Sequence, residues 1–264
     1  NCFILKPSEQ TPLSTFKIAE YLKEAGLPDG VFNIVNGARE VGEGICDHPD
    51  IKAVAFVGSS QVAKIVYSRS TANGKRALCF GGAKNHMIVV PDADQDSTAK
   101  GLLASSMGSA GQRCMAASVA VAVADVDPII DQLVEEARNY KPGVDMGTIV
   151  SKVALERITG YIDEAEKMGA KILIDGRNAT PPEGYEHGYW LGGTILDDVD
   201  PNWPSATDEI FGPVLSIIRT DTLENAMKIE NENQYGNAAA VFTTSGQVAK
   251  TISESASAGM IGIN

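Results

Sequence analysis

Apolar residues in the first third of the chain follow two periods, one typical of strands and one typical of helices. Ser14–Ala25 has apolar residues at helical spacing and ends at Gly26, and Ser59 or Ser60 can cap a further helix over Gln61–Ser70. A short helical stretch precedes the last of three predicted strands, which cover residues 2–5, 31–35 and 53–57. This alternation favours a parallel sheet with helices on its faces, in which the loops after the strands bind ligands.

The same alternation continues beyond residue 80 with longer connections. Strands are predicted at residues 87–90, 119–123, 171–175, 238–243 and 260–263. Helices are predicted from a Ser97 cap toward Met107, over 128–139 behind an Asp127 cap, over 155–168, and from Gln247 onward. Residues 178–189 are rich in Pro, Gly and charge and predict a surface loop. The alternation predicts an α/β fold. The Gly81-Gly82 pair is the best candidate for a hinge, so we expect two domains, residues 1–81 and 82–264.

Composition and charge narrow the class of protein. The chain has 264 residues, of which 44% are hydrophobic and 21% charged, and this suffices for a core without disulfides. Its 22 Lys and Arg against 34 Asp and Glu give a net charge of −12, which argues against nucleic acid or an anionic membrane as partner. The apolar run Met115–Ala124 is far shorter than the ~20 residues that span a bilayer. No targeting signal precedes the first strand, and we expect the chain to start within a larger protein.

The cysteines and histidines indicate no metal site. Four cysteines and three histidines occur without C-x-x-C spacing or a ligand cluster. This usage favours a reducing compartment, in which Cys2, Cys46 and Cys79 serve as small core residues. The expected location is the cytoplasm, or the mitochondrial matrix in a eukaryote.

Cys114 stands apart from the other cysteines because of its setting, Gly111-Gln112-Arg113-Cys114. A neighbouring cation and free backbone N–H groups both stabilise a thiolate and so favour a nucleophile. A structural cysteine beside an arginine would have the same pattern. A Cys–His hydrolase is the competing chemistry, but no histidine has a context that marks it as the base.

Three further features suit a dinucleotide. In Asp208–Pro213, the Gly-Pro turn holds the Glu209 carboxylate near the Phe211 ring, an arrangement that suits a ribose and a flat heterocycle. Lys6 and Glu9 follow the first strand and could bind a pair of sugar hydroxyls. Gly58-Ser59 leads from a strand into a helix whose N-terminus can receive a phosphate, although a full G-x-G-x-x-G is absent. Taken singly, each is also a commonplace turn.

In this order, the four features resemble the aldehyde dehydrogenase superfamily, and the resemblance covers essentially the whole chain. It implies part of a parallel-sheet dinucleotide-binding domain followed by an α/β catalytic domain. It further implies an NAD(P)-dependent enzyme in which Cys114 attacks an aldehyde and ends as a thioester. By the same matching, Lys6 and Glu9 would hold the adenosine ribose and Gly58 and Ser59 would lie near the pyrophosphate. Glu209 would hold the nicotinamide ribose, with Phe211 packed beside it.

The sequence departs from the family pattern in three ways. Ala63 replaces a second glycine of the phosphate-binding turn, and Phe80 stands where the general-base glutamate is usual. The asparagine that helps bind the oxyanion would lie upstream of Asn1, and the arm used for subunit pairing would lie beyond Asn264. We therefore expect the isolated chain to have little activity.

Phe80 favours a subfamily in which a thiol, rather than water, attacks the thioester. A phenyl ring cannot activate water, whereas a thiol needs no base. Ala83–His86 and Gly111–Met115 resemble the CoA-acylating methylmalonate-semialdehyde dehydrogenases. That resemblance implies oxidation of methylmalonate or malonate semialdehyde with NAD, and coenzyme A as acyl acceptor. Arg113 would then pair with the substrate carboxylate, unless it forms an internal salt bridge, and His86 is expected to make a structural hydrogen bond.

Two other functions remain open from the sequence. One is a hydrolytic aldehyde dehydrogenase whose base lies elsewhere. The other is a catalytically silent fragment that acts only through binding or assembly. The expected partners are a small aldehyde and further copies of the same chain, as a dimer or tetramer.

Overall fold

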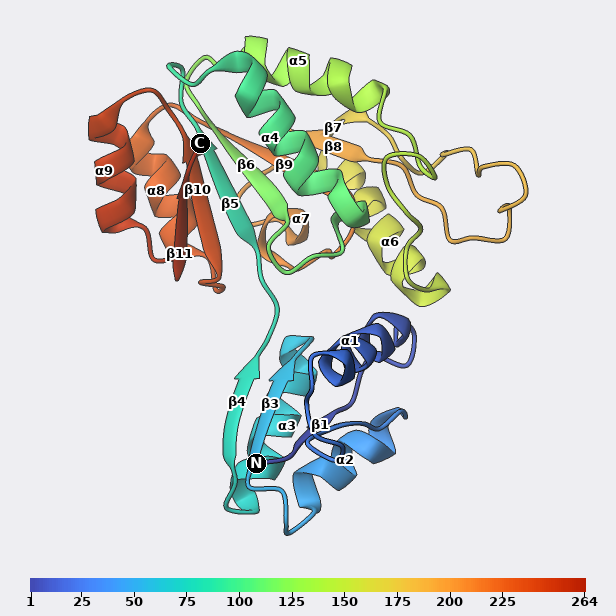
Figure 1. The fold of residues 1–264 in the computed structure, drawn as a ribbon. Coiled ribbons are helices and arrows are strands. Elements are labelled where there is room, and N and C mark those ends of the chain that lie inside the picture. The colour runs from blue at the N-terminus through green and yellow to red at the C-terminus, as the bar shows by residue number, and fades with distance from the viewer. The chain divides into compact units, whose positions relative to one another are not determined.

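The computed structural model describes residues 1–264 and divides into two compact units, Asn1–Gly82 and Ala83–Asn264 (Figure 1). The division follows the Gly81-Gly82 pair. It lies one residue after the boundary expected from the sequence. Each unit is an α/β structure, and none of the helices is long and apolar enough to cross a membrane.

The first unit contains two separate sheets, each of two parallel strands. One pairs β1 (Phe3–Leu5) with β2 (Phe32–Ile34), and the other pairs β3 (Ala53–Val57) with β4 (Arg76–Phe80). The helices are α1 (Leu13–Glu24), α2 (Arg39–Asp47) and α3 (Ser60–Ala72). The expected strands and helices are all present, and Ser59 caps α3 by accepting a hydrogen bond from the Val62 amide. Sequence reasoning missed β4, which begins with a charged residue directly after a turn.

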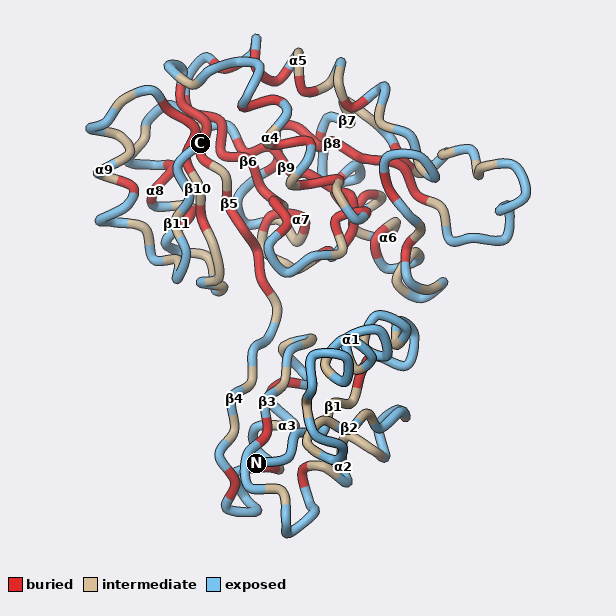
Figure 2. The backbone as a smooth tube through the Cα atoms, viewed as in Figure 1, coloured by how far each residue is buried: buried red, intermediate tan, exposed pale blue.

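Few residues of the first unit are buried (Figure 2). Val57 and Phe80, which pair across β3 and β4, remain 70% and 54% exposed. These two residues therefore contribute little buried area within this unit.

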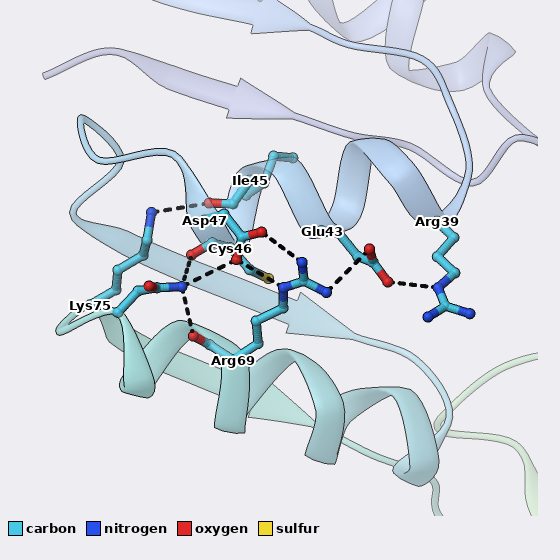
Figure 3. A network of polar contacts seen from close by, with 8 residues as sticks. Arg39, Glu43, Ile45, Cys46, Asp47, Arg69 and Lys75 are labelled. Carbon is cyan, nitrogen blue, oxygen red and sulfur yellow. Dashed lines mark hydrogen bonds and ion pairs between the residues drawn. The ribbon is translucent and has the colours of Figure 1, made fainter.

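A network of charged side chains joins α2 to α3 (Figure 3). The Arg69 guanidinium donates to both oxygens of Asp47, at 2.8 and 2.6 Å, and lies 3.2 Å from Glu43. Arg39 donates to the other oxygen of Glu43 at 2.6 Å. The hydrogen bond from Arg69 lowers the pKa of Asp47, and that from Arg39, followed by the charges of Arg39 and Arg69, lowers the pKa of Glu43.

The second unit is built on a sheet of strand order β11-β10-β5-β6-β9-β8-β7 (Figure 1). All neighbours are parallel except β7 and β8. The strands are β5 (Asn85–Val89), β6 (Ala117–Val123), β7 (Lys171–Ile174), β8 (Thr194–Asp197), β9 (Val214–Thr220), β10 (Ala238–Phe242) and β11 (Met260–Ile263). The helices are α4 (Gln95–Met107), η1 (Gly108–Gly111), α5 (Asp127–Arg138), α6 (Lys152–Met168), α7 (Pro204–Thr207), α8 (Leu223–Glu232) and α9 (Gly246–Ser255).

Helices cover both faces of this sheet. Val119 and Val121 of β6 pack in one cluster with residues of α6, α7, α8 and α9. Ala120 and Ala122 of the same strand pack in a second cluster with α4 and α5. Alternate residues of β6 thus enter opposite cores, as expected for a central strand of a parallel sheet. The sheet is consequently a rigid support for the turns at its edges.

The structure corrects two predicted helix caps and adds elements. Asp94, not Ser97, caps α4, and its carboxylate accepts a hydrogen bond from the Ser97 amide. Asp127 is the first residue of α5 rather than its cap, and it accepts a hydrogen bond from Arg219 at 2.7 Å. Sequence reasoning missed β8, β9, α7 and α8.

The network between α2 and α3 should make the first unit sensitive to acid. A carboxylate with a lowered folded-state pKa stabilises the fold above its unfolded pKa of about 4 and loses that effect as pH falls through its folded pKa. We expect unfolding of the first unit by urea to need less denaturant as pH falls from about 5 to about 3. Arg69→Met should weaken this dependence. NMR signals of α2 and α3 amides report it, with Lys100→Met in the second unit as control. An unchanged pH dependence in Arg69→Met would contradict the assignment.

Candidate active site

Cys114 lies in a turn with an unusual backbone, between η1 and β6. Ser109 and Ala110 have φ angles of 55° and 51°, and Gly111 follows with 64°. Residues other than glycine rarely adopt this left-handed region, because the Cβ crowds the backbone. Such strain persists only where neighbouring structure enforces it, and it is concentrated at functional sites.

Contact with a second segment enforces this turn. A Cβ added at Gly111 would overlap the carbonyl group of Gly212, so only glycine allows the approach. The second segment is itself left-handed at Phe211, with φ 55°. Two strained turns from distant parts of the sequence therefore interlock through a pair of glycines.

This contact gathers most of the predicted site of the second unit into one small pocket. Cys114, Arg113, Glu209 and Phe211 all line it. The Cys114 side chain is exposed, and the Phe211 ring is 38% exposed. Glu209 is oriented by its Oε1, which accepts a hydrogen bond from the Ala83 amide at 2.9 Å. Residues that carry a thiol, a carboxylate, a guanidinium and an aromatic ring thus line one pocket.

Two asparagines hold the backbone of Cys114. The Cys114 carbonyl accepts hydrogen bonds from Asn85 Nδ2 and Asn237 Nδ2, each at 2.9 Å. Asn85 begins β5 and also donates to the Ala116 carbonyl, whereas Asn237 directly precedes the neighbouring strand β10. Sequence reasoning assigned no role to Asn237. A polar residue just before an apolar strand was the only available signal.

Arg113 does not form the internal salt bridge that was the alternative to a substrate-binding role. Its Nη2 donates to the carbonyls of Ala104 and Ser105, at 2.9 and 2.8 Å, in the last turn of α4. Arg113 makes no ion pair. A cation is favourable at a helix C-terminus, where carbonyls are unpaired. The guanidinium is therefore fixed beside the pocket without a carboxylate of its own.

The pocket lies at the amino ends of the parallel strands, not at the carboxyl ends that we expected to bind ligands. Cys114, Glu209 and Asn237 precede β6, β9 and β10, respectively. The reason is that both strained turns are connections that lead into strands. In the first unit, the residues predicted to bind the coenzyme follow the carboxyl ends of β1 and β3.

The predicted coenzyme residues of the first unit fall into two pairs. Lys6 Nζ lies 3.5 Å from Glu9 Oε2 and donates to the Gly37 carbonyl at 2.7 Å. Gly58 and Ser59 join β3 to the N-terminus of α3. The Lys6–Glu9 ion pair thus follows a strand of one sheet, and the N-terminus of α3 follows a strand of the other.

Lys84 and His86 are buried near the pocket residues and are unsuited to act as free ions. Lys84 is 2% exposed and donates to the Ser205 carbonyl at 2.8 Å. Burial lowers the pKa of Lys84 to about 7, against the opposing charges of Asp208 and Glu209. Burial also lowers the pKa of His86 to about 4, although a hydrogen bond with the Lys84 backbone opposes the shift. No group of three or more His, Cys, Asp or Glu side chains could hold a metal ion.

The fold is α/β, and its pocket brings an exposed cysteine together with a carboxylate residue and an aromatic residue. The chain belongs to the aldehyde dehydrogenase family, whose profile matches residues 1–264. It is 44% identical to a methylmalonate-semialdehyde/malonate-semialdehyde dehydrogenase [acylating], mitochondrial, from Rattus norvegicus, and 43% identical to a malonate-semialdehyde dehydrogenase from Pseudomonas aeruginosa. These alignments cover 100% of the chain but 50% and 54% of the two relatives, so the chain spans about half their length.

Solved structures agree with this assignment. A putative methylmalonate-semialdehyde dehydrogenase from Sinorhizobium meliloti, crystallised with NAD, superposes with a TM-score of 0.95 at 45% identity, over 100% of this chain and 55% of that one. An aldehyde dehydrogenase from Mycobacterium tuberculosis complexed with NAD+ gives 0.92 at 32% identity, over 99% and 55%. The resemblance inferred from the motifs is thereby confirmed for family and fold.

Cys114 should be the most reactive cysteine of the chain. It is exposed beside the Arg113 cation, whereas Cys46 is buried and burial raises the pKa of the Cys79 thiol. Cys2 is exposed but has no neighbouring cation in its sequence. Iodoacetamide at neutral pH should label Cys114 first, as followed by peptide mass spectrometry, with Cys114→Ala as control. Faster labelling of Cys46 or Cys79 in the folded chain would disprove this ranking.

Proposed function

We propose that the chain carries the nucleophile and part of the coenzyme site of an enzyme that oxidises methylmalonate or malonate semialdehyde with NAD and transfers the acyl group to coenzyme A. The observation that carries this proposal is the pocket in which Cys114, Arg113, Glu209 and Phe211 meet. The printed names of the relatives support the substrate class and the acylating outcome. Because the chain spans about half of those relatives, the activity proposed is that of the whole protein.

Cys114 begins the reaction. Its thiolate adds to the aldehyde carbon, and the carbonyl electron pair moves to oxygen, which gives a thiohemiacetal oxyanion. When the carbonyl re-forms, this carbon loses a hydride, for which bound NAD would be the acceptor, and a thioester is left on Cys114. The exposed Sγ is open to a small substrate, while the hydrogen bonds from Asn85 and Asn237 fix the Cys114 carbonyl. The Arg113 guanidinium, already bonded to backbone carbonyls through Nη2, presents its remaining N–H donors to the substrate carboxylate.

Glu209 and Phe211 suit the nicotinamide half of the coenzyme, which supplies the hydride acceptor when bound. Glu209 Oε1 is occupied by the Ala83 amide, so Oε2 is directed to a ribose hydroxyl. The exposed part of the Phe211 ring offers a flat apolar surface. In the first unit, Lys6 and Glu9 would hold the adenosine ribose, with Gly58 and Ser59 near the pyrophosphate.

Coenzyme A completes the reaction by attacking the thioester on Cys114, so that the acyl group moves from one sulfur to the other. Phe80 occupies the position of the usual base, and a phenyl ring cannot deprotonate water. A thiol is partly ionised at neutral pH and needs no such help. With loss of CO2 from the carboxylate, malonate semialdehyde yields acetyl-CoA, CO2 and NADH. Methylmalonate semialdehyde yields propionyl-CoA in the same way.

The cellular setting and assembly follow the relatives. The rat relative is named as mitochondrial, and another relative is bacterial. We propose the mitochondrial matrix or the bacterial cytoplasm, and a homo-oligomer of the full-length form.

The acyl acceptor can be tested by stopped-flow NADH absorbance. Without coenzyme A, the enzyme should give a burst of one NADH per active site and then turn over slowly, because water attack on the Cys114 thioester is slow. Addition of coenzyme A should restore steady turnover and yield an acyl-CoA product, identified by mass spectrometry.

The other two functions give different results in this assay. Equal steady rates with and without coenzyme A would establish the hydrolytic enzyme and reject the acylating one. A chain that is alkylated at Cys114 yet gives no burst would be catalytically silent. The isolated chain should have little turnover, since one oxyanion donor is typically worth ~10²–10³ in rate and the family's donor lies outside residues 1–264.

Glu209→Gln tests the coenzyme site. The substitution keeps the size of the side chain and its acceptor for the Ala83 amide but removes the charge. A hydrogen bond to a charged group is worth about 1.5–3 kcal/mol, so the KM for NAD should rise or hydride transfer should slow by at least ~10-fold. Glu183→Gln, in an exposed loop, is the matched control. Unaltered kinetics in Glu209→Gln would remove Glu209 from the coenzyme site.

A further inference from the structure

Three side chains on one face of α6 hold the segment Asp208–Gly212. Arg157 Nη1 donates to the Ile210 carbonyl at 2.7 Å and to the Glu209 carbonyl at 3.3 Å. One turn later, Tyr161 Oη donates to Asp208 Oδ2 at 3.1 Å. Between them, buried Ile158 packs so closely under Gly212 that a Cβ there would lie 2.7 Å from Ile158 Cδ1. Spacings of three and four residues put these side chains on a common helix face.

The segment held in this way is strained and needs external contacts. Phe211 has a φ of 55°, which a bulky side chain does not favour. Without hydrogen bonds to the adjoining carbonyls, the turn would relax toward ordinary backbone angles. Arg157 forms no ion pair, so the hydrogen bonds of its guanidinium are those to backbone oxygens.

The segment also determines the far side of the pocket. The Glu209 carboxylate reaches the Ala83 amide from this turn, and Gly111 packs against the Gly212 carbonyl. A shift of the turn would therefore move the Glu209 carboxylate and the Phe211 ring together. It would also loosen the turn that carries Cys114.

We propose that Arg157 and Tyr161 are positioning residues that fix the backbone of residues 208–212 and thereby set where Glu209 and Phe211 lie in the pocket. That this geometry serves coenzyme binding rests on the proposed function. Burial, with the nearby charge of Asp208, raises the pKa of Tyr161 to about 12. The phenol therefore stays protonated and keeps its donor at neutral pH.

The Ala83 amide gives a direct probe that needs no coenzyme, because it donates to the Glu209 carboxylate. Its hydrogen exchange, followed by NMR on the 264-residue chain, should become at least ~10-fold faster in Arg157→Met. Arg157→Lys, which retains one cationic donor, should restore part of the protection, and Tyr161→Phe should give a smaller acceleration. Glu209→Ala sets the rate without the acceptor.

Matched controls separate positioning from general loss of stability. Arg138→Met removes a guanidinium that pairs only with exposed Glu135, and Tyr185→Phe removes a hydroxyl from an exposed loop. Neither should change exchange at Ala83. Unchanged exchange in both Arg157→Met and Tyr161→Phe would overturn the proposal. If Arg157→Met does not fold, Arg157→Lys and Tyr161→Phe decide by the same comparison.

A titration with NAD distinguishes this inference from the function on which it rests. We expect NAD to bind more weakly to both Arg157→Met and Glu209→Ala, with partial rescue in Arg157→Lys. If Glu209→Ala binds NAD as tightly as the unmodified chain, the proposed coenzyme site fails, whatever exchange shows. If only Glu209→Ala weakens binding and Ala83 exchange is unaltered in the α6 variants, the positioning role fails while the coenzyme site stands.

Discussion

The close approach of Gly111 to Gly212 is the constraint on which the pocket depends. Each glycine lies in or beside a turn that contains left-handed residues other than glycine, and a Cβ at Gly111 would overlap the opposite backbone. The strain of Ser109, Ala110 and Phe211 costs of the order of 1–3 kcal/mol per residue, so the rest of the unit must stabilise it. The strained turns place Cys114 and Glu209, from distant segments of the chain, in one pocket.

The central sheet supplies the required support. β6 and β9 are adjacent and parallel, with Val119 opposite Ser216, so the turns that lead into them lie at the same edge. Alternate residues of β6 are buried in both hydrophobic clusters, which fixes the position and direction of the strand. β5 and β10 lie on the other side of β6 and bring Asn85 and Asn237 to the Cys114 carbonyl. The site is therefore a property of strand order rather than of any single motif.

The two units differ in how much of an apolar core they have. The second has a large apolar core on both faces of its sheet, whereas the first has two short sheets with exposed strands (Figure 2). In the first unit, ion pairs of Arg69 with Asp47 and Glu43 connect α3 to α2 (Figure 3). Exposed ion pairs are weak and are screened by salt. The contribution of these pairs therefore falls as the ionic strength rises and as Asp47 and Glu43 are protonated.

The sequence by itself determined the elements whose signals are local. Helical periodicity located α1, the Ser59 cap located α3, and apolar runs located β3, β6 and β11, because propensity and capping act over a few residues. The setting of Cys114 and of Glu209 likewise marked both turns of the pocket. Only the tertiary structure decided that these turns interlock, that the pocket lies at the amino edge of the sheet, and that Asn237 and Arg157 donate hydrogen bonds to the backbone of the two turns. Those relations depend on strand order and helix packing between segments that are distant along the chain, and no local pattern of residues encodes such pairings.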